Sequence, residues 1–196
     1  YLCSAFLTYL FIDIYIKKNN LKISQKDNLI YVLLAVVADV MPLREINRFL
    51  CKNLLESFDI NKDQIISYLF KLNKIKKKLE LDDLGFFLGP IFNSAGRIDD
   101  ANQIVELLTT NSSFKKRDIL EKINSLNLKR KKIENQYFDK INLNAISKED
   151  GIIYIYEPYL PEGIIGIIAS KLKEHFNKPC VILTKSGDKI KGSARS

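Results

Sequence analysis

Cysteine, proline and glycine are scarce in this chain of 196 residues, and each scarcity excludes a class of protein. The three cysteines are scattered and lack Cys-x-x-Cys spacing, which argues against a disulfide framework or a structural zinc site and predicts a reducing compartment, the cytoplasm. Five prolines and eight glycines leave no room for a low-complexity linker. The single histidine, His175, has no Ser, Cys or Asp at triad-like spacing. We therefore expect a folded protein without these sites.

Long hydrophobic runs are equally rare. The segment from Tyr1 to Ile16 is the one candidate for a membrane span, but it carries Asp13 and is shorter than the roughly 20 residues that a span needs. We expect a buried core helix there and no membrane contact. The chain begins at Tyr1 without a Met and stops at Ser196 within a Gly-Ser-Ala-Arg-Ser run, so we expect it to be a piece of something longer.

Positive charge exceeds negative charge along the chain. There are 31 Lys and Arg against 23 Asp and Glu, a net charge of +8, which serves solubility or suits an anionic partner such as nucleic acid. Positions 114 to 140 hold nine Lys or Arg and four Asp or Glu, so one predicted helix carries +5 of this total. This long basic helix is the best candidate for a domain boundary.

The apolar pattern predicts an α/β protein whose first part is mostly helical. Buried helices are expected over 1–18 and 27–38, and amphipathic ones over 43–58 and 63–79. From Leu84 to Gly96, glycines and a proline interrupt every period, which predicts a shaped loop.

The second part begins with a short helix, capped by Asp99 or Asp100, that ends near Thr110. The basic helix then covers about 114–143. After it the pattern becomes α/β, with strands over 151–156, 180–184 and from 189, a glycine turn at 163–166 and a helix over 167–176. The sequence thus predicts a second, truncated α/β domain.

Asp39 stands at the end of an apolar helix, immediately before the turn at Pro42. A carboxylate buried there would need a partner, and a divalent cation is one of the few that keeps it ionised. The alternative is a helix-ending Asp that accepts hydrogen bonds from local amides.

Three further clusters have features of phosphate-binding sites. In the first, small residues let the backbone approach a ligand and an arginine offers a planar fork. In the second, two glycines open a helix whose N-terminus favours anions, without the Lys-Ser/Thr ending of a P-loop or dinucleotide spacing. The third combines cations, hydroxyls and small residues. The candidate residues are Asn93, Ser94, Gly96 and Arg97; Gly163, Gly166 and Ser170; and Lys191, Gly192, Ser193 and Arg195. Tight turns, close helix packing and a surface strand edge are the alternatives.

In this order, the motifs resemble those of the RecJ single-stranded-DNA exonucleases of the DHH phosphoesterase superfamily. The matching segments are 38–43, 85–101, 163–172 and 192–196. The resemblance implies the C-terminal part of a DHH domain over 1–113, a connecting helix over 114–145 and a truncated DHHA1 domain over 146–196. It also implies Mn²⁺- or Mg²⁺-dependent hydrolysis of single-stranded DNA from the 5′ end, in DNA repair and recombination. Asp39 would be a catalytic metal ligand, and the arginine clusters would hold phosphates of a strand threaded between the domains.

Two kinds of departure from the family pattern leave alternatives open. The Asp-His-His triplet that names the superfamily is missing, so most metal ligands are absent and we expect this chain alone to be inactive. Ile91 stands where the family has an Arg, and Pro161 where it usually has a His. The alternatives are a non-catalytic remnant that binds single-stranded nucleic acid and a phosphodiesterase for small nucleotides.

Overall fold

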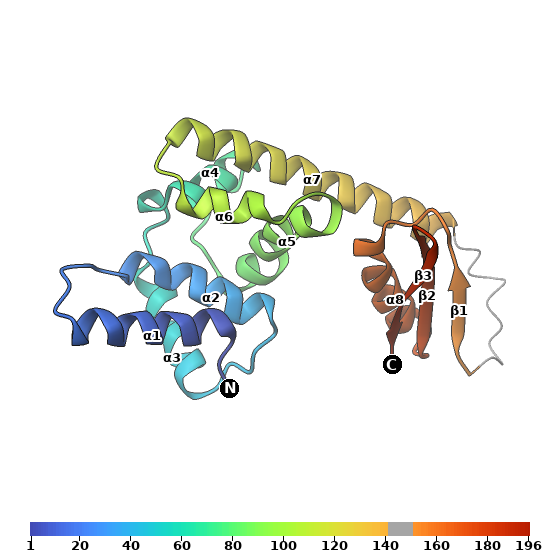
Figure 1. The fold of residues 1–196 in the computed structure, drawn as a ribbon, viewed down its shortest axis with the longest axis horizontal. Helices are drawn as coiled ribbons and strands as arrows, with labels where there is room; N and C mark the ends of the chain where they lie inside the picture. Colours follow the sequence, from blue (N-terminus) through green and yellow to red (C-terminus); the bar gives the residue numbers. More distant parts are fainter. Residues whose placement is uncertain (141–150) are drawn as a thin grey trace. The chain divides into compact units, whose positions relative to one another are not determined.

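The computed structural model describes residues 1–140 and 151–196 of the chain (Figure 1). These residues divide into two compact units, Tyr1–Phe92 and Asn93–Ser196. The division falls inside a helix, whereas the limits expected from the family resemblance are 1–113, 114–145 and 146–196. The boundaries of the DHH domain, the connecting helix and the DHHA1 domain therefore stay a prediction.

The first unit is built of helices. Apolar stretches form the longer ones, and Asp63 caps the fourth by accepting hydrogen bonds from the amides of Ile65 (2.9 Å) and Ile66 (2.8 Å). Helix α2 (Leu29–Ala38) lies at the centre, with five buried side chains. The elements are α1 (Ser4–Lys18), η1 (Lys26–Asn28), α2 (Leu29–Ala38), α3 (Glu45–Ser57), η2 (Ile60–Lys62), α4 (Gln64–Leu72), the π-helix η3 (Asp83–Leu88) and α5 (Gly89–Ile98), which runs on into the second unit.

The shaped loop expected over residues 84–96 is wrong, because this segment is helical through η3 and α5. Pro90 is the second residue of α5 and directly follows the π-helical turn η3, where the regular α-helical hydrogen-bond pattern is already interrupted. A Cβ on Gly85 would lie 3.2 Å from Val37 Cγ1, and one on Gly89 would lie 2.9 Å from the Leu84 carbonyl oxygen. Close packing therefore explains these glycines.

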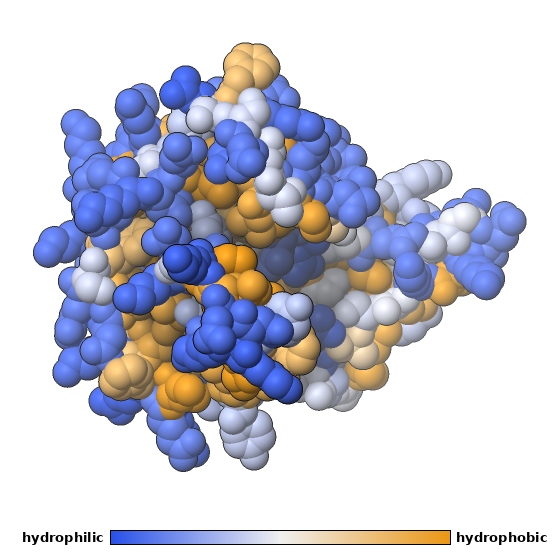
Figure 2. Space-filling model, turned by 60° about the vertical axis from the view of Figure 1, so that its left-hand side comes forward, coloured by the Kyte–Doolittle hydropathy of each residue, from blue (hydrophilic) through white to orange (hydrophobic). Residues whose placement is uncertain are grey.

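Helix α1 corrects a second expectation, that of a buried core helix. Only Phe6 and Ile16 are buried in it, because α1 is apolar on all sides while its packing partners cover only part of its surface. Phe11 is 70% exposed. Figure 2 shows that apolar side chains also reach the surface among hydrophilic ones on the side of the molecule in view. Among the described residues, no helix is long and apolar enough to cross a membrane.

The second unit joins helices to a three-stranded sheet whose strands are β1 (Ile153–Tyr156), β2 (Cys180–Ser186) and β3 (Lys189–Arg195), in the order β1-β2-β3 (Figure 1). Strand β1 pairs parallel to β2, with α8 (Glu162–Phe176) as the crossover, and β3 returns antiparallel to β2. Gly187, at φ 58°, occupies the left-handed region in the tight turn of this hairpin. The elements are α6 (Asn102–Thr109), α7 (Ser113–Lys140), β1 (Ile153–Tyr156), α8 (Glu162–Phe176), β2 (Cys180–Ser186) and β3 (Lys189–Arg195).

Helix α8 covers one face of this sheet. Its apolar residues share a buried core with Ile153 of β1 and with Cys180 and Ile182 of β2, and Ile133 and Tyr137 of α7 pack against the same core. The register pairs Cys180 with Arg195 and Ile182 with Ser193. Because side chains at paired positions point to the same face, Ser193 and Arg195 of β3 lie on the α8 side.

The expected glycine turn at 163–166 is also wrong, because α8 begins at Glu162 and includes both glycines in its first turns. The basic helix is confirmed over Ser113–Lys140, and its expected residues 141–143 lie outside the described part of the chain. The short helix ends at Thr109 as expected, and the Asp100 side chain accepts from the Asn102 amide at its start (2.9 Å).

Candidate nucleic-acid interface

Arg195 of β3 lies across the N-terminal half of α8. Its Nε donates to Ser170 Oγ (3.2 Å), and its Nη1 donates to Ser193 Oγ (3.1 Å) and to the Ala194 carbonyl oxygen (2.7 Å). A Cβ on Gly166 would lie 3.0 Å from Arg195 Nη2. Glycine at this position therefore leaves room for the guanidinium above the helix, and two candidate clusters that are separate in the sequence come together.

The α8 N-terminus adds partial positive charge to that of the Arg195 guanidinium. The first-turn amides of a helix have no partners within the helix, and the helix dipole places partial positive charge at this end. Ser170 Oγ donates to the Gly166 carbonyl oxygen (3.1 Å) while accepting from Arg195, so it orients the guanidinium. An arginine, two hydroxyls and a helix N-terminus together suit a phosphate.

Lys191 and Gly192, also expected to contact substrate, have other surroundings. The Lys191 ammonium pairs with the Glu162 carboxylate, and the hydrogen bond from Lys191, followed by one from Ser186, lowers the pKa of Glu162. A Cβ on Gly192 would overlap Leu183 Cδ2, on the sheet face away from α8. Lys191 thus forms an ion pair with Glu162 at the start of α8, and Gly192 allows close packing against Leu183 in the sheet.

Arg97, near the end of α5, is joined to the start of α8. Its Nη1 donates to the Gly163 carbonyl oxygen (2.9 Å), and a Cβ on Gly163 would lie 2.7 Å from Arg97 Cα. Arg97 is half-buried, and its pKa is lowered, first by desolvation and then by the positive charge of Arg130, with a smaller effect from Arg195. Arg97 and Arg195 therefore act on each other electrostatically at the same end of α8.

The remaining residues of the first cluster behave differently. Ser94 is buried, and its Oγ donates to the Ile123 carbonyl oxygen of α7 (3.1 Å). Asn93 and Gly96 are exposed on α5, where a Cβ on Gly96 would meet Ala101 Cβ at 3.4 Å. Of this cluster, Arg97 is the residue with a hydrogen bond to α8, through the Gly163 carbonyl oxygen.

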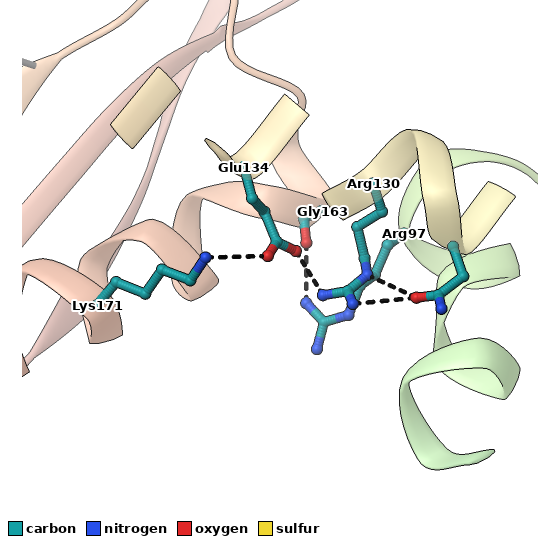
Figure 3. A network of polar contacts seen from close by, with 6 residues as sticks. Arg97, Arg130, Glu134, Gly163 and Lys171 are labelled. Atoms are coloured by element: carbon teal, nitrogen blue, oxygen red, sulfur yellow. Dashed lines mark hydrogen bonds and ion pairs between the residues drawn. The ribbon is translucent and has the colours of Figure 1, made fainter. Parts of the chain in front are cut away.

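The sequence-based reasoning missed three buried polar residues of α7. Asn127, Arg130 and Glu134 are 4%, 9% and 4% exposed, although they belong to the long basic helix. Arg130 Nε and Nη2 donate to Asn127 Oδ1 (3.2 and 3.0 Å), and Arg130 Nη1 pairs with Glu134 Oε1 (Figure 3). Their spacing of three and four residues, which places them on one face, was the available signal.

Asp39 lies in the first unit, as the C-cap of α2. It is exposed, because α2 ends here and the chain turns outward, so the argument from burial for a cation partner does not apply, and the alternative of a helix-ending Asp holds as far as its position goes. Val40 follows with φ 53°, a strained conformation for a β-branched residue, and the Met41 amide closes the turn on the Val36 carbonyl oxygen (3.0 Å). The buried Asn47 donates from Nδ2 to the Pro42 carbonyl oxygen (3.0 Å) and so fixes the loop after Asp39.

Metal ligands are sparse. Across residues 1–140 and 151–196, the structure contains no group of three or more His, Cys, Asp or Glu that could hold a metal ion. An exposed carboxylate such as Asp39 suits a hard cation as one ligand of several. The described residues do not supply the others.

The combination of a helical unit, a long basic helix and a small mixed sheet can be compared with known proteins. The single-stranded-DNA-specific exonuclease RecJ of Escherichia coli is 33% identical over 207 aligned residues, which cover 100% of this chain and 36% of the relative. RecJ of Dickeya dadantii is 36% identical over 174 aligned residues, which cover 84% of this chain and 30% of the relative. The chain is RecJ-like.

The solved structures agree on the fold. RecJ from Thermus thermophilus in complex with Mn²⁺ superposes with a TM-score of 0.72 over 84% of this chain and 24% of its own, at 24% sequence identity. An exonuclease RecJ bound to manganese gives a TM-score of 0.71 and is covered over 41% of its length. No family model matches the sequence. The RecJ-like chain spans about a third of the length of these curated relatives.

Proposed function

We propose that this chain is the strand-holding part of a metal-dependent exonuclease that hydrolyses single-stranded DNA from the 5′ end, in DNA repair and recombination. The observation that carries the proposal is the convergence of Arg97, Arg195, Ser193 and Ser170 on the N-terminal half of α8. The RecJ relatives, named as single-stranded-DNA-specific exonucleases, give this anion site its substrate.

In the proposed site each residue has a distinct task. Arg195, held by Ser170 and Ser193, offers its remaining N–H groups to one phosphate. Arg97, anchored through Nη1 on Gly163, directs the rest of its guanidinium to a second. Gly163 and Gly166 allow this close approach, and Ser94 and Gly192 have packing roles instead. The contacts are to phosphates, so binding is expected to be insensitive to base sequence.

The metal chemistry of the proposed reaction lies mainly outside this chain. Mn²⁺ or Mg²⁺ would supply an activated water and neutralise charge on the phosphate, and Asp39 would contribute one carboxylate ligand. Because the described residues hold no group of three ligands, we expect the chain alone to bind single strands without degrading them. Release of mononucleotides by the purified chain in Mn²⁺, lost on Asp39→Ala, would contradict this.

Binding of 5′-labelled oligothymidylate, followed by fluorescence anisotropy at several salt concentrations, tests the proposal. Two neutralised phosphates predict a slope of log affinity against log salt of about −1.4, since each contributes about −0.7 on single strands. Arg195→Ala should weaken binding about tenfold or more, because a charge-assisted hydrogen bond is worth roughly 1.5 to 3 kcal/mol. It should also reduce the slope by about 0.7.

Lys185→Ala is the matched control, because it removes the same charge from the exposed sheet face away from α8. Its affinity should stay within about twofold of the unsubstituted chain, in line with the small effect of a distant screened charge. Equal effects of Arg195→Ala and Lys185→Ala would overturn the assigned site. Mononucleotides that compete as well as the oligomer would favour a small-nucleotide enzyme.

A further inference from the structure

The buried polar group on α7 is unusual in its charge balance. Asn127, Arg130 and Glu134 lie on one face of the helix, and Glu134 Oε2 also faces the Lys171 ammonium of α8 at 3.4 Å. The Glu134 carboxylate therefore has a cation at each oxygen (Figure 3). Buried ion pairs of this kind add little net stability, so a role other than stability is worth testing for this one.

Arg97 lies within electrostatic reach of this pair. Figure 3 shows the Arg97 and Arg130 guanidinium groups side by side, with Glu134 next to them. The charges of Arg130 and Glu134 both act on Arg97, the first repelling and the second attracting it. In the described residues around this point, three cations surround one carboxylate, and Arg97 has no acidic partner of its own.

We propose that Arg130 is a positioning residue that occupies Glu134 and thereby leaves Arg97 available for a substrate phosphate. Arg130 suits this task because Asn127 Oδ1 holds two of its nitrogens while Nη1 faces the carboxylate. Without Arg130, Glu134 Oε1 loses its donor, and Arg97 is the half-buried cation beside it. An Arg97–Glu134 pair would then compete with the phosphate. This inference rests on the proposed phosphate site at α8.

A merely structural role for the pair predicts a different result. Removing Arg130 would then lower the melting temperature but leave the affinity of the folded fraction unchanged. Under the competition proposed here, the affinity lost with Arg130 returns when Glu134 is neutralised in the same chain, although the charge of Arg130 is still missing. This rescue is the distinguishing readout.

The test uses Arg130→Met, Glu134→Gln and the double variant in the full chain, with two probes. One probe is labelled oligothymidylate, and the other is inorganic pyrophosphate, an anion that needs no nucleic-acid function. Asp118→Asn is the control for Glu134→Gln, since Asp118 is exposed on the same helix and carries the same charge. Melting curves define a temperature at which each variant is folded.

We expect Arg130→Met to weaken both probes about tenfold and the double variant to return to within about threefold of the unsubstituted chain. Glu134→Gln should tighten binding by about threefold, and Asp118→Asn should change it less. If Arg130→Met does not fold, Glu134→Gln decides, because its amide oxygen still accepts from Arg130. Absence of rescue, or unchanged binding in Glu134→Gln, overturns the inference.

The two probes separate this inference from the proposed function. Pyrophosphate binding that follows the expected pattern, without oligothymidylate binding, would support the positioning role and contradict the single-strand function. Oligothymidylate binding without rescue would do the reverse. A chain that binds neither probe would contradict both.

Discussion

Gly163 is the position in the second unit where an added methyl group would meet the backbone of another element most closely. A Cβ there would lie 2.7 Å from Arg97 Cα, 2.8 Å from its carbonyl carbon, and nearer still to its carbonyl oxygen. Backbone atoms cannot rotate away as the end of a side chain can. An ordinary contact of 3.4 Å to the Cα alone requires α5 and α8 to separate by about 0.7 Å, and the nearer carbonyl oxygen requires more. Gly163→Ala therefore forces these helices apart.

The expected cost follows from two opposing effects. Overpacking of this kind costs about 1–3 kcal/mol, and the weakened Arg97–Gly163 hydrogen bond adds about 1 kcal/mol. Alanine returns up to about 1 kcal/mol through its better helix propensity. We expect a net loss of about 1–3 kcal/mol, which lowers the melting temperature by roughly 2–4 °C per kcal/mol for a chain of this size.

Gly166→Ala, one turn further along α8, is the matched control. The atoms that its Cβ would meet are the ends of the Arg195 and Ser193 side chains, at 3.0 and 3.2 Å, and both can move. The melting temperature should therefore stay the same or rise, while displacement of Arg195 lowers oligothymidylate affinity. Circular dichroism and anisotropy measure the two effects. Equal melting temperatures for both variants would refute the reasoning from backbone contact.

Three further predictions concern stability. Val40→Gly should raise the free energy of unfolding in urea titrations by about 1 kcal/mol, because Val40 is 87% exposed and strained at φ 53°. Val40→Ala should raise it less. No gain in Val40→Gly would show that the turn is unstrained. Tyr31→Phe should lower the free energy of unfolding by about 1 kcal/mol and Asp63→Ala by about 2 kcal/mol. The second loss is larger because Asp63 both accepts from the Tyr31 hydroxyl (2.7 Å) and caps α4. Equal losses in the two variants would argue against a separate capping effect. Lys191 lowers the pKa of Glu162 from 4.5, so their ion pair stabilises the chain above that pH, and its contribution is lost as pH falls through the lowered pKa. Glu162→Gln should therefore make the melting temperature depend less on pH in this range. A curve of melting temperature against pH that is unchanged in the variant would contradict this.

Helix and strand positions were largely predictable where the apolar pattern was strong. Helix α2 and strand β2 were placed within a few residues, because both are continuous apolar segments bounded by polar breaks. The segment from Leu84 to Gly96 was mistaken for a loop because its glycines and Pro90 look like breakers in a linear pattern. In three dimensions they are small residues packed between helices, a distinction that needs the neighbours.

The candidate site was only partly accessible from sequence. The four clusters were located by residue type, but Ser94 and Arg97 stand three positions apart and differ in burial for reasons set by α7 and α8. Burial of Arg130 and Glu134 was missed although their spacing places them on one face, because a stripe of one Asn, one Arg and one Glu in a lysine-rich helix resembles an ordinary solvated face.

The contact between Arg97 and Gly163 also bears on the order in which the second unit assembles. It joins residues 66 positions apart, whereas the β2–β3 hairpin closes locally around Gly187. Each doubling of loop length adds about 0.6 kcal/mol of closure entropy, so the hairpin is favoured to form early and the α5–α8 contact late. The Arg195 half of the site can then exist while the Arg97 half is open. A single strand that contacts both halves would stabilise the α5–α8 contact. Binding should therefore slow amide hydrogen exchange near Gly163 more than it slows exchange in the β2–β3 hairpin.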